Sequence, residues 1–144
     1  LARANRFICE RSQSNRFVTL FLFSLDESGK GHYVGAGHNP AYLYRNEDGT
    51  IEELRSANLV LGAFDFADYS ATPIQLNQGD LLVVYSDGLT EAENMKGDMF
   101  EEERLIKLIQ ENGSKGAGML RRAFWMPSRT SLRIAPRPTI SPSC

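Results

Sequence analysis

Apolar residues occur in short runs separated by glycine, asparagine and aspartate, which is the pattern of strands joined by tight turns. Asp48-Gly49 lies between two alternating segments and predicts a hairpin turn. A second hairpin is predicted around the glycine-containing turn at 26–31. The strands of these hairpins, and one further short strand, are predicted at Phe17–Leu25, Tyr33–Gly37, Ala41–Arg45, Thr50–Leu54 and Ile74–Leu76.

Leu81–Tyr85 is a run of five apolar residues and predicts a strand that is buried on both faces, at the centre of the domain. The run ends at Ser86, Asp87 and Gly88, and the chain beyond it does not return to alternation, so we do not expect a hairpin here. The end of a strand is a rigid support for a functional side chain, and an adjacent glycine lets the backbone approach a ligand. Asp87 is therefore a candidate metal ligand or catalytic acid.

Apolar residues at helical spacing occur in two segments, one before the first predicted strand and one after the last. Leu1–Arg11 has no N-cap in front of it, and we interpret it as the last turns of a helix whose beginning is missing. Phe100–Glu111 is amphipathic and is stopped by an Asn-Gly pair. This order of elements predicts an α+β fold with an antiparallel sheet. Because Phe17–Leu25 and Leu81–Tyr85 are apolar on each face, we expect helices on one side of the sheet and a second sheet on the other.

The composition is that of a soluble globular domain. The chain has 144 residues, enough for one core, and neither a membrane-spanning apolar run nor a signal peptide is recognisable, so we expect a cytoplasmic location. The two cysteines, Cys9 and Cys144, have no spaced partners and predict neither a disulfide framework nor a zinc site.

The charge distribution divides the chain into two parts. No acidic residue follows Glu111, whereas six basic residues and four of the six prolines do. Such a basic tail raises the alternative of nucleic-acid binding. We give this alternative little weight, because the tail has no helical face, and we expect no nucleic-acid partner.

Five segments carry a pattern that extends along most of the chain: Phe17–Phe21, Tyr33–Ala41, Leu61–Gly62, Gly79–Ala92 and Phe100–Leu105. The second contains Ala-Gly-His-Asn-Pro, and the fourth contains Ser-Asp-Gly. In this order they resemble the metal-dependent (PPM-type) serine/threonine phosphatases of the stage II sporulation protein E group. That group includes bacterial phosphatases that act on anti-sigma-factor antagonists. The resemblance extends from about Ala4 to Ala123.

The resemblance implies an αββα sandwich of four layers, incomplete in this chain, with two Mn²⁺ or Mg²⁺ ions at one end of the paired sheets. It also implies that a metal-bound hydroxide attacks the phosphorus of phosphoserine or phosphothreonine. Carboxylate oxygens suit these hard ions, and two adjacent ions activate a shared water, so no nucleophilic side chain is expected. By position, Asp87 corresponds to a metal ligand of the family.

The resemblance also places four supporting residues near the metal end. Gly88 is expected to allow close packing at the ligand. Glu91 is expected to be either a carboxylate that supports the site or a solvated surface residue. His38 and Asn39 lie in the Ala-Gly-His-Asn-Pro turn, where a histidine that caps the turn is favoured over phosphate contact or proton transfer. His32 is interpreted as a surface strand residue.

The sequence lacks most of the metal ligands that the resemblance implies. A Gly-Gly-Asp-type segment is expected before residue 1, and an Asp-Asp-Ile-Thr-like motif is expected near the other end, although no Asp follows Asp98. We therefore interpret residues 1–123 as a partial phosphatase domain and expect the fragment itself to be inactive.

The tail at 124–144 has a genetic explanation. If one base were lost just after the Ala123 codon, the other reading frame of the tail can encode Ser-Asp-Asp-Ile-Thr. Our hypothesis is that this tail is out of frame and disordered. The loss of the last core strand would then leave an exposed sheet edge.

Other phosphatase chemistries are excluded by spacing. A phosphoaspartyl enzyme needs a carboxylate two residues after its nucleophile, where Asp87 has Leu89. A cysteine phosphatase needs an arginine six residues after its cysteine, where Cys9 has Asn15. A glycine-rich phosphate loop with a lysine is also missing.

The sequence thus predicts a protein serine/threonine phosphatase domain, with a phosphoprotein substrate and an upstream sensor or receiver domain in the parent protein. A homodimer is left open, and no membrane contact is expected for this segment. The alternative is a non-catalytic regulatory or interaction domain that retains the fold.

Overall fold

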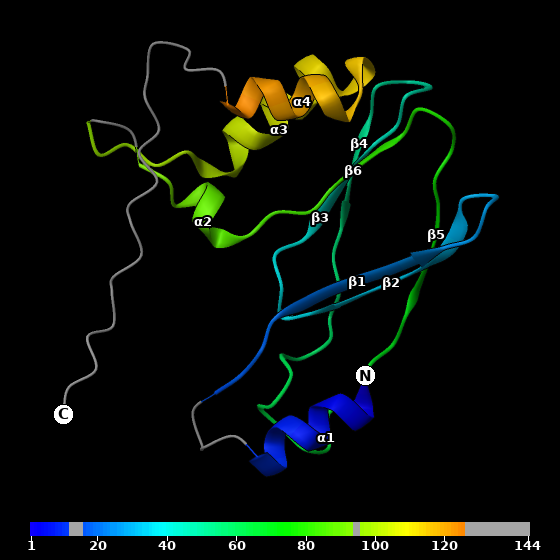
Figure 1. Ribbon diagram of the computed structural model, residues 1–144, viewed down its shortest axis with the longest axis vertical. Helices are drawn as coiled ribbons and strands as arrows, with labels where there is room; N and C mark the ends of the chain where they lie inside the picture. The colour runs from blue at the N-terminus through cyan, green and yellow to red at the C-terminus, as the bar shows by residue number, and fades with distance from the viewer. Residues whose placement is uncertain (12–15, 94–95, 126–144) are drawn as a thin grey trace.

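The structure is a computed structural model, which describes residues 1–11, 16–93 and 96–125 (Figure 1). Its helices are α1 (Ala2–Arg11), α2 (Asp87–Thr90), α3 (Glu101–Asn112), the 3₁₀ turn η1 (Gly113–Lys115) and α4 (Ala117–Trp125). Its strands are β1 (Leu20–Leu25), β2 (Lys30–Ala36), β3 (Ala41–Tyr44), β4 (Ile51–Leu54), β5 (Thr72–Gln75) and β6 (Leu81–Val83).

Within the described residues, these strands form two antiparallel three-stranded sheets, in the orders β1-β2-β5 and β4-β3-β6. Both predicted hairpins are confirmed: Leu20 is paired with Ala36, and Ala41 with Leu54. At the second turn, Gly49 has a φ of 74°, a conformation that glycine adopts without strain. The chain passes from the first sheet to the second twice, once between β2 and β3 and once between β5 and β6.

In the sheet β4-β3-β6, β3 is the middle strand, and it is covered on both faces. All four of its residues are buried, and successive side chains of a strand point to opposite faces. Ala41 and Leu43 belong to the core between the two sheets. Tyr42 and Tyr44 belong to the core that the second sheet forms with α3 and α4. The described chain is therefore layered as sheet, sheet and helices.

The prediction that Leu81–Tyr85 is the central, doubly buried strand is wrong. In the described residues, β6 pairs with β3 alone, and each of its three residues is partly exposed. The expectation that β1 is covered on both faces is also wrong, since Leu22 and Phe23 are 51% and 46% exposed. An apolar run shows that a segment favours burial, but its neighbours in the sheet are set by tertiary pairing.

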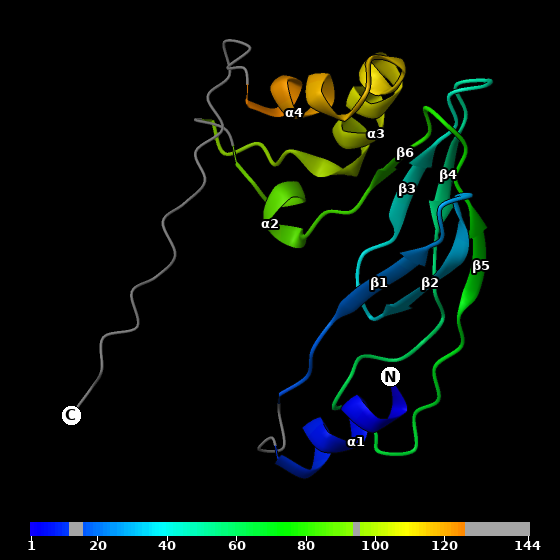
Figure 2. The ribbon, with the colours of Figure 1, turned by 45° about the vertical axis from the view of Figure 1, so that its right-hand side comes forward.

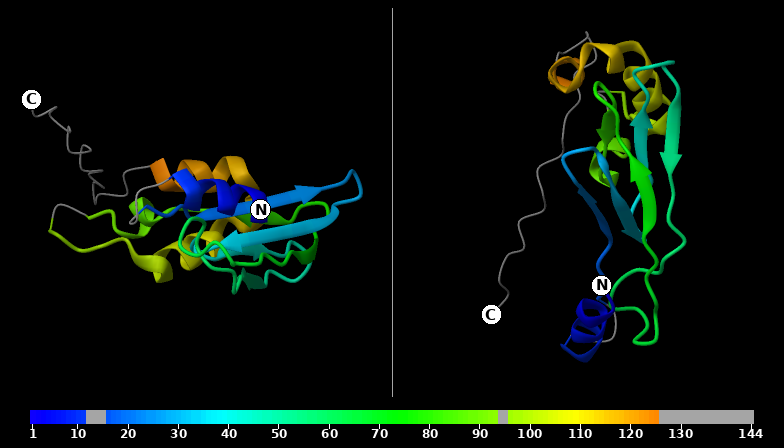
Figure 3. Two further views of the ribbon diagram at one scale, coloured as in Figure 1. Left: turned by 90° about the horizontal axis from the view of Figure 1, so that it is seen from below. Right: turned by 90° about the vertical axis from the view of Figure 1, so that its right-hand side faces the viewer.

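The helices lie at opposite ends of the paired sheets, with α1 at one end and α3 and α4 at the other (Figures 2 and 3). Asn5 of α1 is fully buried: its amide donates to Phe64 O at 2.8 Å and its side-chain oxygen accepts from Gly62 N at 2.8 Å. These bonds fasten the helix to the loop that follows β4. Of the described helices, none has the length and apolar character needed to cross a membrane.

A buried ion pair stabilises the segment between β5 and β6, where the chain crosses from the first sheet to the second for the second time. The Asp80 side chain is 2% exposed and lies 2.9 Å from the Arg45 guanidinium, which also donates to Gln75 O at 2.7 Å. The same carboxylate accepts from the backbone N–H groups of Asn46 and Asn77, both at 3.0 Å. Burial raises the pKa of Asp80, but these hydrogen bonds and the guanidinium outweigh burial, so the net pKa is lowered from 3.8.

We expect Asp80→Asn to lower the free energy of unfolding by about 1–3 kcal/mol, because the amide nitrogen would face N–H groups that now bind carboxylate oxygens. Urea unfolding of the protein measures this change. Glu47→Gln removes the same charge from an exposed turn residue and should change stability by less than about 0.5 kcal/mol. Equal losses in the two variants would contradict the role of the buried pair.

The stabilisation by Asp80 also has a defined pH dependence. Because the folded pKa is lowered, the contribution is complete above the ordinary value of 3.8 and is lost as the pH falls from there through the folded pKa. We therefore expect the stability difference between the wild type and Asp80→Asn to shrink in this acidic range. A difference that stayed constant there would contradict the assignment.

Candidate functional site

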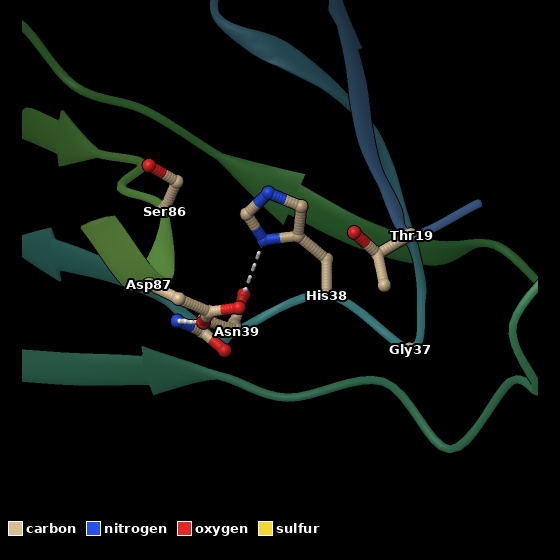
Figure 4. A pocket seen from close by; sticks show the side chains of 6 residues that line it. All are labelled: Thr19, Gly37, His38, Asn39, Ser86 and Asp87. Carbon is tan, nitrogen blue, oxygen red and sulfur yellow. Dashed lines mark hydrogen bonds between the residues drawn. The ribbon is translucent and has the colours of Figure 1, made fainter. Parts of the chain in front are cut away.

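A pocket forms where the two sheets and the segment after β6 meet (Figure 4). It is lined by residues from three segments that lie far apart in the sequence: Thr19 just before β1, Gly37, His38 and Asn39 between β2 and β3, and Ser86 and Asp87 after β6. The predicted Ala-Gly-His-Asn-Pro turn and the predicted carboxylate thus meet in one place.

Gly37 lets the chain turn out of the first sheet and into the second. Its φ is 61°, and a Cβ atom there would lie 2.0 Å from Cγ1 of Val60. Both the backbone conformation and the packing therefore require glycine. This turn fixes the direction in which His38 and Asn39 leave the sheet.

A hydrogen bond joins the turn to the carboxylate. The Asn39 amide nitrogen donates to Oδ1 of Asp87 at 2.6 Å. Asp87 is the first residue of α2, and Ser86, in an extended conformation, is the N-cap of this helix. The expectation that Asp87-Gly88 is not a hairpin turn is confirmed. Asp87 is exposed, so its carboxylate is accessible from the pocket.

The His38 ring is partly buried, and its orientation is set by two contacts. Nδ1 lies 3.1 Å from the backbone oxygen of Asn39. The ring also meets Phe21 edge-on, with a centroid distance of 6.5 Å and an interplanar angle of 62°. Figure 4 shows Nδ1 facing Asn39 and the other ring nitrogen on the opposite side of the ring.

Tyr85 anchors the chain immediately before the pocket. Its hydroxyl donates to Glu102 of α3 at 2.5 Å, and its ring stacks on Tyr42 at a centroid distance of 5.8 Å. Burial, followed by the bond to the Glu102 carboxylate, raises the pKa of Tyr85 well above its ordinary value. The phenol is therefore a neutral structural donor, and it holds the end of the β6 segment against α3.

The other predicted residues, Gly88, Glu91 and His32, do not line the pocket. A Cβ atom at Gly88 would meet only Ser86 Oγ, at 3.9 Å, so its role in close packing stays a prediction. Glu91 is exposed at the C-terminal end of α2, and its supporting role also stays a prediction. His32 is an exposed residue of β2, as expected.

Sequence reasoning missed Thr19 and did not count Ser86 among the site residues. The available signal for Thr19 was a hydroxyl side chain inside the otherwise apolar run that begins at Phe17. That signal is weak, because a threonine is common in strands. Only the packing of the sheets shows which polar residue of the run reaches the pocket.

The pocket offers the type of oxygen ligand that a hard divalent cation prefers, but it offers too few carboxylates. Carboxylate, amide and hydroxyl oxygens are the ligands that Mg²⁺ and Mn²⁺ prefer. Asp87, however, is the one carboxylate that lines the pocket, and the described residues contain no group of three His, Cys, Asp or Glu that could hold a metal. These residues do not form a two-ion centre by themselves, and we derive no reaction step through a metal.

Two comparisons of the sequence point to one family. The sequence pattern of the stage II sporulation protein E (SpoIIE) family matches residues 1–126. The chain is also 33% identical, over 114 residues, to the phosphoserine phosphatase RsbU of Bacillus subtilis (strain 168). That stretch covers 78% of this chain and 33% of RsbU, so the chain spans about a third of the length of this relative.

Solved structures show the same fold. The RsbU and RsbW domains of Rv1364c from Mycobacterium tuberculosis match with a TM-score of 0.66 and 24% identity, over 83% of this chain and 33% of that one. The PP2C phosphatase domain of SpoIIE from Bacillus subtilis, solved with a fragment of its regulatory domain, matches with a TM-score of 0.62 and 22% identity, over 83% of this chain and 37% of that one. The expected fold class, antiparallel sheets with flanking helices in an incomplete PP2C-like sandwich, is confirmed. By the match of its sequence, the chain belongs to the stage II sporulation protein E (SpoIIE) family.

Proposed function

We propose that this chain is part of a protein serine/threonine phosphatase domain that hydrolyses phosphoserine or phosphothreonine on a regulatory protein, such as an anti-sigma-factor antagonist. The observation that carries the proposal is the pocket in which Asp87 is held by Asn39. It lies on a PP2C-like fold, in a chain similar to a phosphoserine phosphatase. The relative's substrate class is thus the best guide to the substrate of this chain.

In this proposal, Asp87 is the contribution of the chain to a centre of two Mn²⁺ or Mg²⁺ ions. Such ions, when bound, supply an activated water and neutralise phosphate charge. Asn39 holds Oδ1 of the carboxylate, which leaves Oδ2 as the oxygen that is free to bind a cation. The remaining carboxylates come from parts of the parent protein beyond the described residues. An upstream sensor or receiver domain would control the activity.

The shortage of carboxylates favours a second candidate, a non-catalytic regulatory or interaction domain that retains the fold. The described residues offer the pocket but no cluster of three metal-binding side chains. The two candidates differ in one measurable property, which is phosphate release from a phosphoserine protein by the full-length product of the gene, with the reading frame after Ala123 corrected.

We expect this frame-corrected, full-length protein to release phosphate in the presence of Mn²⁺ and to stop releasing it when a chelator is added. Asp87→Asn should lower kcat/KM by about 10²-fold or more and raise the Mn²⁺ concentration that is needed, because a charged ligand is lost. Asp65→Asn removes a charge from an exposed position outside the pocket and serves as the matched control. If neither the chelator nor Asp87→Asn changes the rate of phosphate release, the metal-centre proposal is wrong. An inactive wild type would favour the non-catalytic candidate.

We also propose that residues 1–123 are a partial phosphatase domain and that 124–144 are translated out of frame. Helix α4 continues to Trp125, and the ring of Phe124 lies 6.1 Å from that of Phe100, centroid to centroid. Residues 126–144, on which most of this hypothesis depends, lie outside the described residues.

Sequencing the coding DNA tests the frame hypothesis directly. We expect the frame that opens after the Ala123 codon to encode Ser-Asp-Asp-Ile-Thr. If that frame is interrupted or lacks the motif, the tail belongs to the protein as written, and the hypothesis is wrong.

A further inference from the structure

Asp87 lies between two residues that are anchored in the same core. Tyr85, two residues before it, is buried in the core that the second sheet forms with α3 and α4. Leu89, two residues after it, is partly buried against that core. Ser86 is extended and is the one residue between the anchored ring and Asp87. The backbone that carries the carboxylate is therefore fixed from the side of the helices, whereas the bond from Asn39 orients its side chain.

The hydroxyl of Tyr85 is the polar part of this anchor. It donates to Oε1 of Glu102, in the first turn of α3, at 2.5 Å. Tyr85 is 7% exposed, whereas Glu102 belongs to the exposed surface, so a helix carboxylate reaches inward to a buried phenol. A buried hydroxyl without a partner would be costly. The bond therefore ties the end of the β6 segment to the first turn of α3.

The backbone directly before Glu102 is strained. Glu101 has a φ of 61°, and among the described residues it is the one non-glycine residue with a positive φ. Such a conformation persists only where the surrounding structure imposes it. On one side of Glu101, Phe100 is buried in the same core as Tyr85, and its N–H group donates to Ala92 O at 2.8 Å. On the other side, Glu102 accepts the Tyr85 hydroxyl, so the strained residue lies between two fixed points.

We propose that Glu102 is a positioning residue for the phosphatase reaction: through the Tyr85 hydroxyl it fixes the backbone from which Asp87 reaches the pocket, an inference that rests on the proposed function. Glu102 does not line the pocket, so it acts through Tyr85 and not on a bound phosphate. A misplacement of about 1 Å can cost about 10²-fold in rate. The Tyr85 ring would stay stacked on Tyr42 without the bond, so we expect a smaller cost than that of losing the carboxylate itself.

The experiment removes the bond from either side in the frame-corrected, full-length protein. Tyr85→Phe removes the hydroxyl and keeps the ring, and Glu102→Ala removes the acceptor. We expect each to lower kcat for a phosphoserine protein by about 10-fold and to change KM by less than about twofold, because the residues that line the pocket remain. Glu102→Gln keeps an oxygen that can accept the hydroxyl hydrogen and should retain most of the wild-type kcat.

A double variant separates positioning from a general loss of stability. If the bond acts through Asp87, Tyr85→Phe should lower kcat no further in a protein that already carries Asp87→Asn. A loss of stability alone would lower the folded fraction, and hence the rate, in both backgrounds. The matched control is Glu103→Gln, which removes the same charge from the next, exposed residue of α3 and should leave kcat unchanged.

Amide hydrogen exchange without added metal gives a readout that does not depend on turnover. Residues 85–91 include the backbone bonds of α2 and should exchange faster in Tyr85→Phe than in the wild type, whereas β2 should be unchanged. The inference is overturned, while the proposed function stands, by unchanged exchange at 85–91, by an unchanged kcat, by equal losses in the two backgrounds, or by a loss in Glu102→Gln as large as that in Glu102→Ala. A wild type that does not hydrolyse the phosphoserine protein would overturn both.

Discussion

The hydrogen bond between Asn39 and Asp87 is the interaction on which the site depends. It spans 48 residues of sequence and joins the link between β2 and β3 to the segment after β6. The two segments meet because β3 and β6 are antiparallel neighbours in one sheet, with Tyr42 opposite Val83, so the residues just before β3 lie beside the residues just after β6. The position of the carboxylate is therefore a consequence of the pairing of β3 with β6 rather than of the local sequence around Asp87 alone.

Two passages of the chain set how the sheets lie relative to each other, and each is fixed by a different physical means. At the first, Gly37 allows close contact with Val60, where any side chain would collide. At the second, the buried carboxylate of Asp80 forms an ion pair with the Arg45 guanidinium and accepts hydrogen bonds from two backbone N–H groups. The first is a steric constraint that no other residue meets, and the second is a polar network that is stable because each of its members has a partner.

The local parts of the fold could be predicted from the sequence, and the non-local parts could not. The hairpin at Asp48-Gly49 and the helices at the two ends follow from turn chemistry and apolar spacing, and the structure confirms them. The central strand was assigned to the apolar run at Leu81–Tyr85, but β3 holds that position with the sequence Ala-Tyr-Leu-Tyr. Both of its tyrosines are buried, because helices α3 and α4 cover them. Thr19 was missed for a similar reason, since its place in the pocket depends on the sheet packing.

Five of the six residues that line the pocket belong to the two motifs that the sequence analysis singled out, Ala-Gly-His-Asn-Pro and Ser-Asp-Gly. Asn39 makes two separate contacts: its side chain donates to the Asp87 carboxylate of the other motif, and its backbone oxygen lies 3.1 Å from Nδ1 of His38 in its own motif. The first bond depends on the amide, whereas the second would remain with any residue at this position. The orientation of the carboxylate and that of the imidazole are thus set by one residue but are chemically independent.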